Sequence, residues 1–270
     1  MFRPVALAAL LALAPLPALA FTQDEVLVAR ILPGWRAADG THIAALHLQL
    51  APEWKTYWRA PGEAGIPPMF DWSGSTNLGS VRFLWPRPQI FDVNGMQTIG
   101  YRGELVLPME ITAQDPALPV GLRAMIDLGV CRDICIPAVL ELQADLGVDL
   151  PAPGAFDATI EAALRDRPAT GAEAGLTAIT CAVEPIADGL RVTATLQMPP
   201  AGARETVVME PGQPAIWVSE AQVARHGGQL TAMTDLVAGS GAPFALDQAA
   251  LTVTVLGSER AVEILGCPTR

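Results

Sequence analysis

The sequence GVCRDICIPAVLELQADL, residues 129–146, decides the fold. Cys131 and Cys135 stand four positions apart, with Arg132 and Asp133 between them and Pro137 just after. From position 140 onward, apolar residues at 140, 142, 144 and 146 alternate with polar ones. A period of two is typical of a half-buried strand, so we expect the cysteines at the mouth of a β-hairpin and not on a helix.

Outward from this hairpin, the chain reads as a series of short β-strands. In its first half the expected strands cover residues 26–31, 43–50, 69–72, 81–85, 104–112, 122–130 and 138–146, with a turn expected at Pro33 and Gly34. In its second half they cover 176–183, 190–198, 206–210, 215–219, 229–237, 251–256 and 261–265. Short strands at this spacing, separated by turn residues, are typical of antiparallel sandwiches of the immunoglobulin type.

A proline-rich stretch at 151–154 marks the expected boundary between two domains. Residues 156–167 after it carry a helical pattern, which Pro168 ends,. The sequence therefore predicts an all-β protein with two tandem immunoglobulin-like antiparallel β-sandwich domains joined by a short helical linker. The expected parts are a signal peptide at 1–20, a first sandwich at 21–150, a linker at 151–175 and a second sandwich at 176–270.

The first twenty residues have the features of a signal peptide. Arg3 precedes an apolar run over residues 5–13, and Ala18-Leu19-Ala20 gives the small-x-small pattern that signal peptidase cleaves,. The run is too short for a membrane anchor, and no later run reaches the roughly 18 apolar residues of a spanning helix. We therefore expect cleavage after Ala20 and an exported, soluble mature protein.

The net charge of −11 argues against two classes of partner. The chain has 17 basic and 28 acidic residues, and Lys55 is its only lysine. Nucleic acids and anionic membranes need clustered lysine and arginine, so neither is expected as a partner. The length fits two average domains, each able to form a core without disulfides.

Four cysteines in an exported protein are disulfide candidates before they are metal ligands. A ring closed by Cys131 and Cys135 restricts the unfolded chain little, so it should stabilise far less than the roughly 3 kcal/mol of a 15-residue loop. Redox function explains such a bond better: one thiolate forms a mixed disulfide and the second sulfur resolves it. Neither cysteine has a neighbouring histidine or lysine in the sequence that would mark it as the nucleophile,.

Three other interpretations of this pair stay open. The bond could simply pin the hairpin. A zinc site would lack ligands, because two thiolates are half of a tetrahedral set and His42, His47 and His226 show no metal spacing,. Cu(I) accepts two thiolates, with Met96 or Met125 as additional thioether ligands. No bound cofactor and no metal site are predicted.

The second pair, Cys181 and Cys267, indicates a structural bond. Its members lie 86 positions apart, in the first strand of the second sandwich and just after its last strand. First and last strands can be neighbours in such folds. A loop of this length gives on the order of 4–5 kcal/mol of stabilisation on the chain-entropy model.

The segment around Cys131 and Cys135 resembles the active-site segment of the periplasmic N-terminal region of the DsbD/ScsB thiol:disulfide interchange proteins, and it is most similar to the ScsB branch. The likeness covers nearly all of the expected mature chain. It is carried by further segments, which are PGEAG at 61–65, FDWSGS at 70–75, WPRP at 85–88, IGYRGELVLP at 99–108, AIWVSE at 215–220 and AVEILGCP at 261–268.

The resemblance implies an immunoglobulin-like redox domain in which Cys131 and Cys135 cycle between dithiol and disulfide. It implies a periplasmic location, a membrane electron donor of the DsbD, ScsB or CcdA type, and disulfide-containing periplasmic proteins as substrates. In the DsbD branch an aromatic residue on a cap loop shields the sulfurs. Its counterpart is expected between residues 91 and 101, with Phe91, Met96 and Tyr101 as candidates.

Family members continue into a transmembrane domain, whereas this sequence ends at Arg270, so a separate membrane protein is expected to supply the electrons. The sequence thus predicts an exported thiol-disulfide electron carrier, a protein-disulfide reductase that is not embedded in the membrane. The alternative is a non-catalytic periplasmic binding module, either a Cu(I) carrier using the same cysteines or a partner-recognition module with two inert disulfides.

Overall fold

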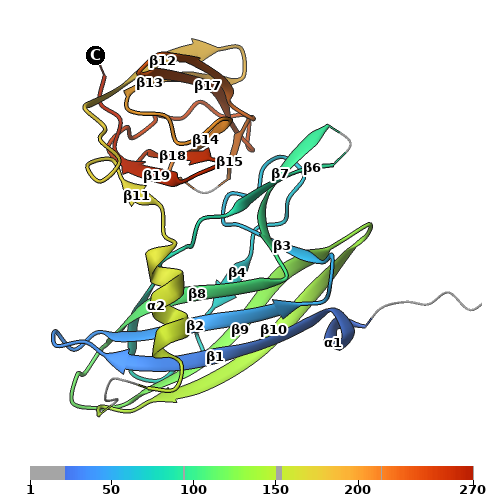
Figure 1. Cartoon of the computed structure of the whole chain (residues 1–270), viewed down its shortest axis with the longest axis vertical. Coiled ribbons are helices and arrows are strands. Elements are labelled where there is room, and N and C mark those ends of the chain that lie inside the picture. The colour runs from blue at the N-terminus through green and yellow to red at the C-terminus, as the bar shows by residue number, and fades with distance from the viewer. Residues whose placement is uncertain (1–21, 94, 150–153, 214, 270) are drawn as a thin grey trace, which may run out of the picture.

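The computed structural model describes residues 22–93, 95–149, 154–213 and 215–269, and these residues form two β-sandwiches that follow one another along the long axis (Figure 1). Nearly all of the regular structure is β-strand, and the strand pairs are antiparallel with one two-residue exception. The protein is therefore all-β, with tandem immunoglobulin-like sandwiches, which confirms the predicted fold class. The signal peptide expected at 1–20 lies outside the described residues.

The first sandwich consists of two sheets, preceded by the short helix α1 (Gln23–Val26). One sheet contains, in spatial order, β1 (Leu27–Arg36), β2 (His42–Leu50), β8 (Glu104–Ala113) and β5 (Leu78–Phe83). The other contains β10 (Cys135–Leu146), β9 (Val120–Cys131), β3 (Lys55–Tyr57), β7 (Met96–Arg102) and β6 (Gln89–Val93), and β4 (Met69–Asp71) pairs with β9. The β9–β10 hairpin therefore forms one side of this second sheet.

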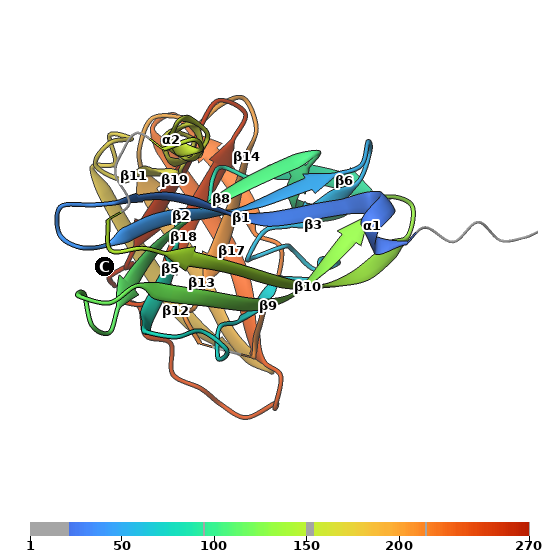
Figure 2. The ribbon, with the colours of Figure 1, turned by 90° about the horizontal axis from the view of Figure 1, so that it is seen from below.

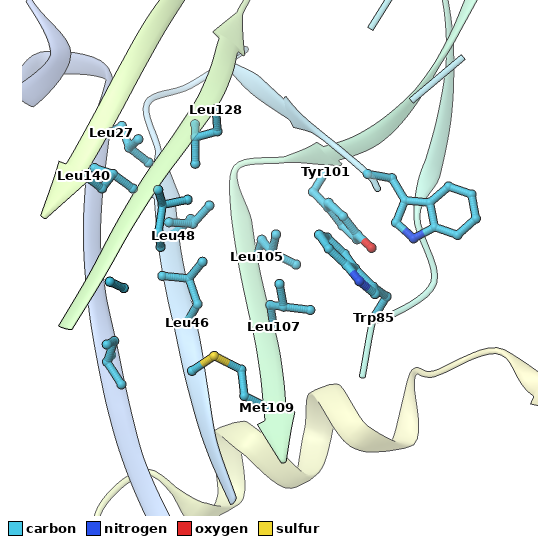
Figure 3. Close-up of a cluster of buried hydrophobic side chains, with 14 of the residues drawn as sticks. Leu27, Leu46, Leu48, Trp85, Tyr101, Leu105, Leu107, Met109, Leu128 and Leu140 are labelled. Atoms are coloured by element: carbon cyan, nitrogen blue, oxygen red, sulfur yellow. The ribbon is translucent and has the colours of Figure 1, made fainter. Parts of the chain in front are cut away.

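Alternate residues of the two sheets fill the space between them (Figure 3). Leu46 and Leu48 of β2 lie opposite Leu107 and Leu105 of β8, and all four are buried. On β9 the even-numbered residues from 120 to 130 belong to the same core. Side chains alternate along a strand, so the odd-numbered residues of β9, including Cys131, lie on the outer face of the sheet.

Helix α2 (Asp157–Arg165) confirms the helix expected after the domain boundary, and it packs on the first sandwich. Ile160 is fully buried in a small cluster with Leu32, Ile43 and Ala45 of β1 and β2. The linker helix is thus anchored to the first domain by its apolar side. Of the proline-rich boundary itself, residues 151–153 lie outside the described residues.

The second sandwich again has two sheets. One contains β12 (Ala178–Ile186), β13 (Gly189–Gln197), β17 (Gln229–Ala238) and β15 (Ile216–Val218), and β16 (Gln222–His226) also pairs with β17. The other contains β11 (Ala169–Thr170), β19 (Ala261–Leu265), β18 (Thr252–Gly257) and β14 (Glu205–Glu210). The core between them includes Val192, Leu196, Leu230, Val253 and Val255, none of which is exposed.

The turn expected at Pro33 and Gly34 is wrong. β1 runs through both residues, with a register shift against β2 between Pro33 and Trp35, and the chain turns where the Ala37 N–H donates to the Thr41 carbonyl. β1 is an edge strand, where a proline without an N–H removes no inter-strand hydrogen bond. The sequence pattern also does not indicate β3, β6, β7 and β16, which are present.

The two sandwiches contact each other through an ion-pair cluster and an apolar patch. Arg59 of the first domain donates to Glu210 at 2.9 Å and to Glu263 at 2.5 Å in the second. Leu256 and Ala261 of the second domain are buried against the core of the first. Viewed from below, the strands of the second sandwich run crosswise to those of the first (Figure 2). These contacts bring β14 and β15 close to the end of the first domain that carries β6 and β7.

Candidate functional site

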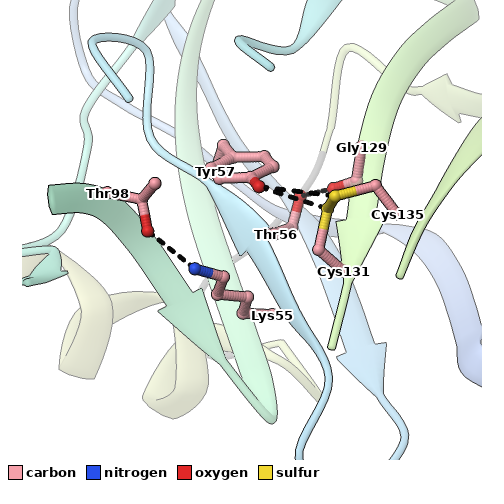
Figure 4. Close-up of a disulfide and its surroundings, with 7 residues drawn as sticks. All are labelled: Lys55, Thr56, Tyr57, Thr98, Gly129, Cys131 and Cys135. Atoms are coloured by element: carbon pink, nitrogen blue, oxygen red, sulfur yellow. Dashed lines mark hydrogen bonds between the residues drawn. A yellow bond between two sulfur atoms is a disulfide. The ribbon is translucent and has the colours of Figure 1, made fainter. Parts of the chain in front are cut away.

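Cys131 and Cys135 form a disulfide at the tip of the β9–β10 hairpin (Figure 4). The two residues are cross-strand partners, and their Cα atoms are 4.1 Å apart. The prediction that the cysteines lie at the mouth of a hairpin is therefore confirmed. Because both side chains belong to the outer face of the sheet, the bond lies outside the core of the sandwich.

Side chains from β3, β6 and β7 lie on the same outer face as the disulfide. Directly opposed residues in antiparallel strands lie on the same face of a sheet. The register sets Lys55 opposite Cys131 and Arg102, and Phe91 opposite Thr98. We call this set the outer patch; its members are Lys55, Tyr57, Phe91, Thr98, Arg102, Cys131 and Cys135.

The two cysteine residues of the disulfide differ in exposure. Cys131 is only 2% exposed, whereas Cys135 is exposed. Ile134, between them, is 58% exposed, so the hairpin tip presents an apolar side chain beside the accessible sulfur. An incoming thiolate or disulfide must reach a sulfur atom directly, and Cys135 is the one that offers such access.

Tyr57 covers the buried sulfur. Its hydroxyl donates a hydrogen bond of 3.2 Å to Cys131 Sγ and lies 3.7 Å from Cys135 Sγ. Burial raises the pKa of Tyr57, so the hydroxyl keeps its proton and remains a donor at neutral pH. A donor at this position stabilises negative charge on sulfur once the disulfide is reduced.

Gly129 explains how Tyr57 comes so close to β9. A Cβ atom at this glycine would lie 3.2 Å from Cε2 of Tyr57 and 3.1 Å from the side chain of Ile66. The Thr56 hydroxyl also donates to the Gly129 carbonyl at 3.0 Å. The glycine two residues before Cys131 therefore leaves the space that the tyrosine ring and Ile66 occupy over the strand.

Lys55 is a buried, positively charged member of the outer patch. Its ammonium donates to Thr98 Oγ1 at 2.6 Å and lies 4.8 Å from the centre of the Phe91 ring. Burial lowers the pKa of Lys55, and the charge of Arg102 lowers it further. In Figure 4 the ammonium points away from the sulfurs, on the far side of Tyr57. The charge of Lys55 is therefore directed at Thr98 and Phe91 and not at the disulfide.

The three residues expected as a shield lie in three different places. Phe91 belongs to the outer patch, where its ring makes cation–π contacts with Lys55 of β3 and Arg102 of β7. Met96 is 52% exposed at the start of β7 and lines the space between the two domains. The expectation that Tyr101 shields the sulfurs is wrong. This residue lies on the core face, stacked on Trp85, and its hydroxyl donates to the Pro86 carbonyl at 2.8 Å.

Cys181 and Cys267 form the second disulfide, which confirms the predicted pairing. Both residues are fully buried, and the bond links β12 of one sheet to the residue that follows β19 of the other. The Cys181 N–H also donates to the Pro268 carbonyl at 2.8 Å. This bond therefore closes the second sandwich within its core.

The described residues contain no group of three or more His, Cys, Asp or Glu side chains that could hold a metal ion. Met125, considered as a copper ligand, lies six residues before Cys131 on β9. At about 3.3 Å per residue, this separation is roughly 20 Å along the strand. The Met125 thioether is therefore too far from the hairpin disulfide to share a metal ion with its sulfurs.

Lys55 and Tyr57 are the site residues that the sequence pattern does not single out. Both belong to a strand of three residues, which is too short for a periodic signal. The sequence offers one other signal for these two residues, because the only lysine of the chain stands within a cluster of aromatic residues at 54–58. Their positions near Cys131 depend on pairing with β9, more than seventy residues later in the chain.

The first sandwich carries a disulfide on its outer face, with Cys135 exposed and Cys131 buried, and this geometry suits thiol-disulfide interchange,. The comparison with protein families agrees: residues 28–146 match the model described as thiol:disulfide interchange protein DsbD, N-terminal. Over these residues the first sandwich is therefore similar to the DsbD N-terminal domain family, in agreement with the resemblance to the DsbD/ScsB proteins seen in the sequence.

The solved structures include the N-terminal periplasmic domain of ScsB from Proteus mirabilis. It is 24% identical to this chain with a TM-score of 0.68, and the alignment covers 93% of this chain and 97% of that chain. The likeness extends over both sandwiches and shows a common fold. No curated protein sequence matches the chain. Among the described residues, no helix is long and apolar enough to cross a membrane.

Proposed function

We propose that this protein is an exported thiol-disulfide electron carrier of the periplasm, which takes electrons from a membrane dithiol protein and reduces disulfides of periplasmic proteins. The observation that carries the proposal is the asymmetry of the hairpin disulfide, with Cys135 exposed and Cys131 2% exposed beneath Tyr57. The match of residues 28–146 to the DsbD N-terminal family supports it.

The exposed sulfur is the proposed nucleophile. In the reduced carrier, the Cys135 thiolate attacks one sulfur of the substrate disulfide, which forms a mixed disulfide and releases one substrate thiolate. The Cys131 thiolate then attacks Cys135 Sγ, which closes the protein disulfide and releases the second substrate thiolate. The two leaving thiolates take up protons, so two electrons and two protons pass from the carrier dithiol to the substrate.

Recharging uses the same atoms in reverse. A thiolate of the membrane donor attacks the exposed Cys135 Sγ, and Cys131 leaves as a thiolate. The Tyr57 hydroxyl, 3.2 Å from Cys131 Sγ, stabilises this leaving group. The ring of Phe91, held by Lys55 and Arg102, is the proposed shield that limits discharge to wrong partners in an oxidising compartment.

The roles of the two cysteines can be separated by trapping. In Cys131→Ser cells the accessible Cys135 cannot be released from a mixed disulfide, so adducts with donor and substrates should accumulate on non-reducing gels. In Cys135→Ser cells only the buried Cys131 remains, and adducts should be rare. Equal adducts in both variants would reverse or remove the assigned roles, and no adducts in either would refute the carrier function.

A further inference from the structure

A cleft of 640 Å³ lies between the two domains. Its first-domain wall is formed by the loop from Arg59 to Pro67 and by the start of β7. Its second-domain wall is formed by β14 and β15 with residues 211–213 and 219–221. Figure 1 shows the β6–β7 hairpin on the side of the first sandwich that faces the second sandwich. The disulfide chemistry described above does not use this space.

The second-domain wall of the cleft consists of strand edges. All five residues at 206–210 of β14 line the cleft. Since side chains alternate along a strand, continuous lining means that the backbone edge itself faces the cleft. Among the described strands, β14 pairs only with β18, and β15 pairs only with β17. Each strand therefore presents one edge whose N–H and C=O groups can pair with an added strand.

Exposed apolar side chains from both domains line the cleft. Trp217 of β15 is 47% exposed and Met96 of β7 is 52% exposed, and both line the space. A large exposed aromatic residue in a concave site is a typical anchor for a bound side chain. The two residues come from different domains, so each wall of the cleft offers apolar surface to a bound polypeptide.

The charge of the cleft is negative. Its charged residues are Glu63, Glu210 and Glu220, against the single cation Arg59, and Arg59 is already paired with Glu210. Glu63 and Glu220 are both exposed. The carboxylates favour a ligand that carries positive charge, and they oppose a second copy of this acidic chain.

The cleft and the disulfide share one loop. Gly65 and Pro67 line the cleft, while Ile66 between them packs over Gly129, two residues before Cys131. β7 connects the two sites in the same way, because Gln97 lines the cleft and Thr98 binds Lys55 of the outer patch. The loop at residues 65–67 and the start of β7 thus connect the cleft to the surroundings of the disulfide.

We infer that the interdomain cleft binds an extended, basic and apolar segment of the polypeptide whose disulfide is reduced, as an added strand beside β14 or β15. The inference rests on the proposed function and deepens it, because it makes the second sandwich the substrate-recognition part of the carrier. A segment held there places its cysteine near Cys135, so long and unfolded substrates react faster than small disulfides.

The test compares peptide and small disulfides as oxidants of the pre-reduced full chain. The probes are the disulfide-linked dimer of the peptide Lys-Val-Leu-Cys-Val-Lys, blocked at both ends, the same dimer with glutamate in place of lysine, and oxidised glutathione. The lysine peptide should be reduced fastest. Trp217→Ala should slow it by about fivefold or more, since truncation of an interface anchor typically has an effect of this size, and should leave the glutathione rate unchanged.

Matched variants separate the cleft from general surface effects. Leu265→Ala, 74% exposed on the same domain and outside the cleft, should change no rate, whereas Met96→Ala on the opposite wall should repeat the effect of Trp217→Ala. The double variant Glu63→Gln/Glu220→Gln should remove the preference for the lysine peptide over the glutamate peptide. Thermal unfolding of each variant checks that the domain is folded.

Three outcomes would overturn the inference. If both the peptides and glutathione are reduced at rates that Trp217→Ala and Met96→Ala leave unchanged, the cleft is not the substrate site, although the carrier function stands. If no probe is reduced, the proposed function itself fails. If light scattering shows a dimer that Trp217→Ala dissociates, the cleft is an interface between copies of this chain.

Discussion

The hydroxyl of Tyr57 should set the acidity of the buried cysteine. It donates to Cys131 Sγ at 3.2 Å and is buried beside it. Tyr57→Phe removes the donor and keeps the ring that covers Gly129. We therefore expect this variant to retain the fold and to lose only the stabilisation of negative charge on sulfur.

The magnitude follows from the difference between two hydrogen bonds. A bond to a neutral acceptor contributes about 0.5–1.5 kcal/mol and a bond to a charged one about 1.5–3 kcal/mol, so the thiolate loses about 1–1.5 kcal/mol more than the thiol. Since one pKa unit corresponds to about 1.36 kcal/mol, the pKa of the Cys131 thiol should rise by about one unit. Above that pKa, the reduction potential should fall by about 20–30 mV, because the reduced form is the one that loses stability.

Thiolate absorbance and the rate of alkylation, measured against pH on the reduced protein, give the thiol pKa values directly. Tyr101→Phe is the matched control, because it also loses a buried tyrosine hydroxyl, but one that donates to the Pro86 carbonyl on the core face. An unchanged thiol pKa in Tyr57→Phe, or an equal shift in Tyr101→Phe, would refute the assigned role of Tyr57.

Three further predictions test other parts of the molecule. The double variant Cys181→Ala/Cys267→Ala should lose about 2–5 kcal/mol in the free energy of unfolding of the second sandwich, measured by denaturant titration, whereas loss of the hairpin disulfide should have a much smaller effect. Phe91→Ala should speed oxidation of the reduced protein by glutathione disulfide by about fivefold or more, since two cation–π contacts of about 0.5–1 kcal/mol each hold the ring. Ile90→Ala, on the other face of β6, should leave this rate unchanged. Hydrogen bonds from Arg167 and Thr170 lower the pKa of Glu173 from 4.5 to about 2, so its carboxylate should stabilise the fold above pH 4.5. That contribution should disappear as the pH falls from 4.5 to about 2, and Glu173→Gln should flatten this part of the curve of unfolding temperature against pH.

The strands and the hairpin disulfide could be predicted because their signal is local. Alternation along residues 138–146 specifies a strand with one buried face, and β10 (Cys135–Leu146) has that pattern. The same reasoning failed at Pro33 and Gly34, since turn residues are also tolerated in an edge strand with a bulge. Whether β1 lies at an edge is a property of the whole sheet, which local sequence does not contain.

The composition of the site depended on pairing between distant strands. Phe91 and Tyr101 look equivalent as aromatic residues near the expected cap loop, yet the register of β6 and β7 puts Phe91 opposite Thr98 on the outer face. Tyr101 pairs with Thr56 and points into the core. Register is set by contacts between strands that are far apart in sequence, so the sequence could place the cysteines but could not choose between these two aromatic residues.

The second sandwich supplies one wall of the cleft and carries a disulfide of its own. Its own disulfide is fully buried, while residues of β14 and Trp217 of β15 line the cleft. The ion pairs of Arg59 with Glu210 and Glu263 hold the two walls of the cleft together. We therefore regard the first domain as the redox unit and the second as the part that selects what it reduces.

The central claim is that the 131–135 disulfide is redox-active and that the 181–267 disulfide is structural. A redox titration with differential alkylation and mass spectrometry tests this claim most directly. The protein is equilibrated over a range of mild dithiol reductant concentrations, alkylated, and the state of each cysteine is read separately. We predict that the 131–135 bond opens and closes reversibly with a defined midpoint, whereas the 181–267 bond stays oxidised until the second sandwich unfolds. Reduction of both bonds at the same midpoint, or resistance of the 131–135 bond at every concentration at which 181–267 is intact, would contradict the account.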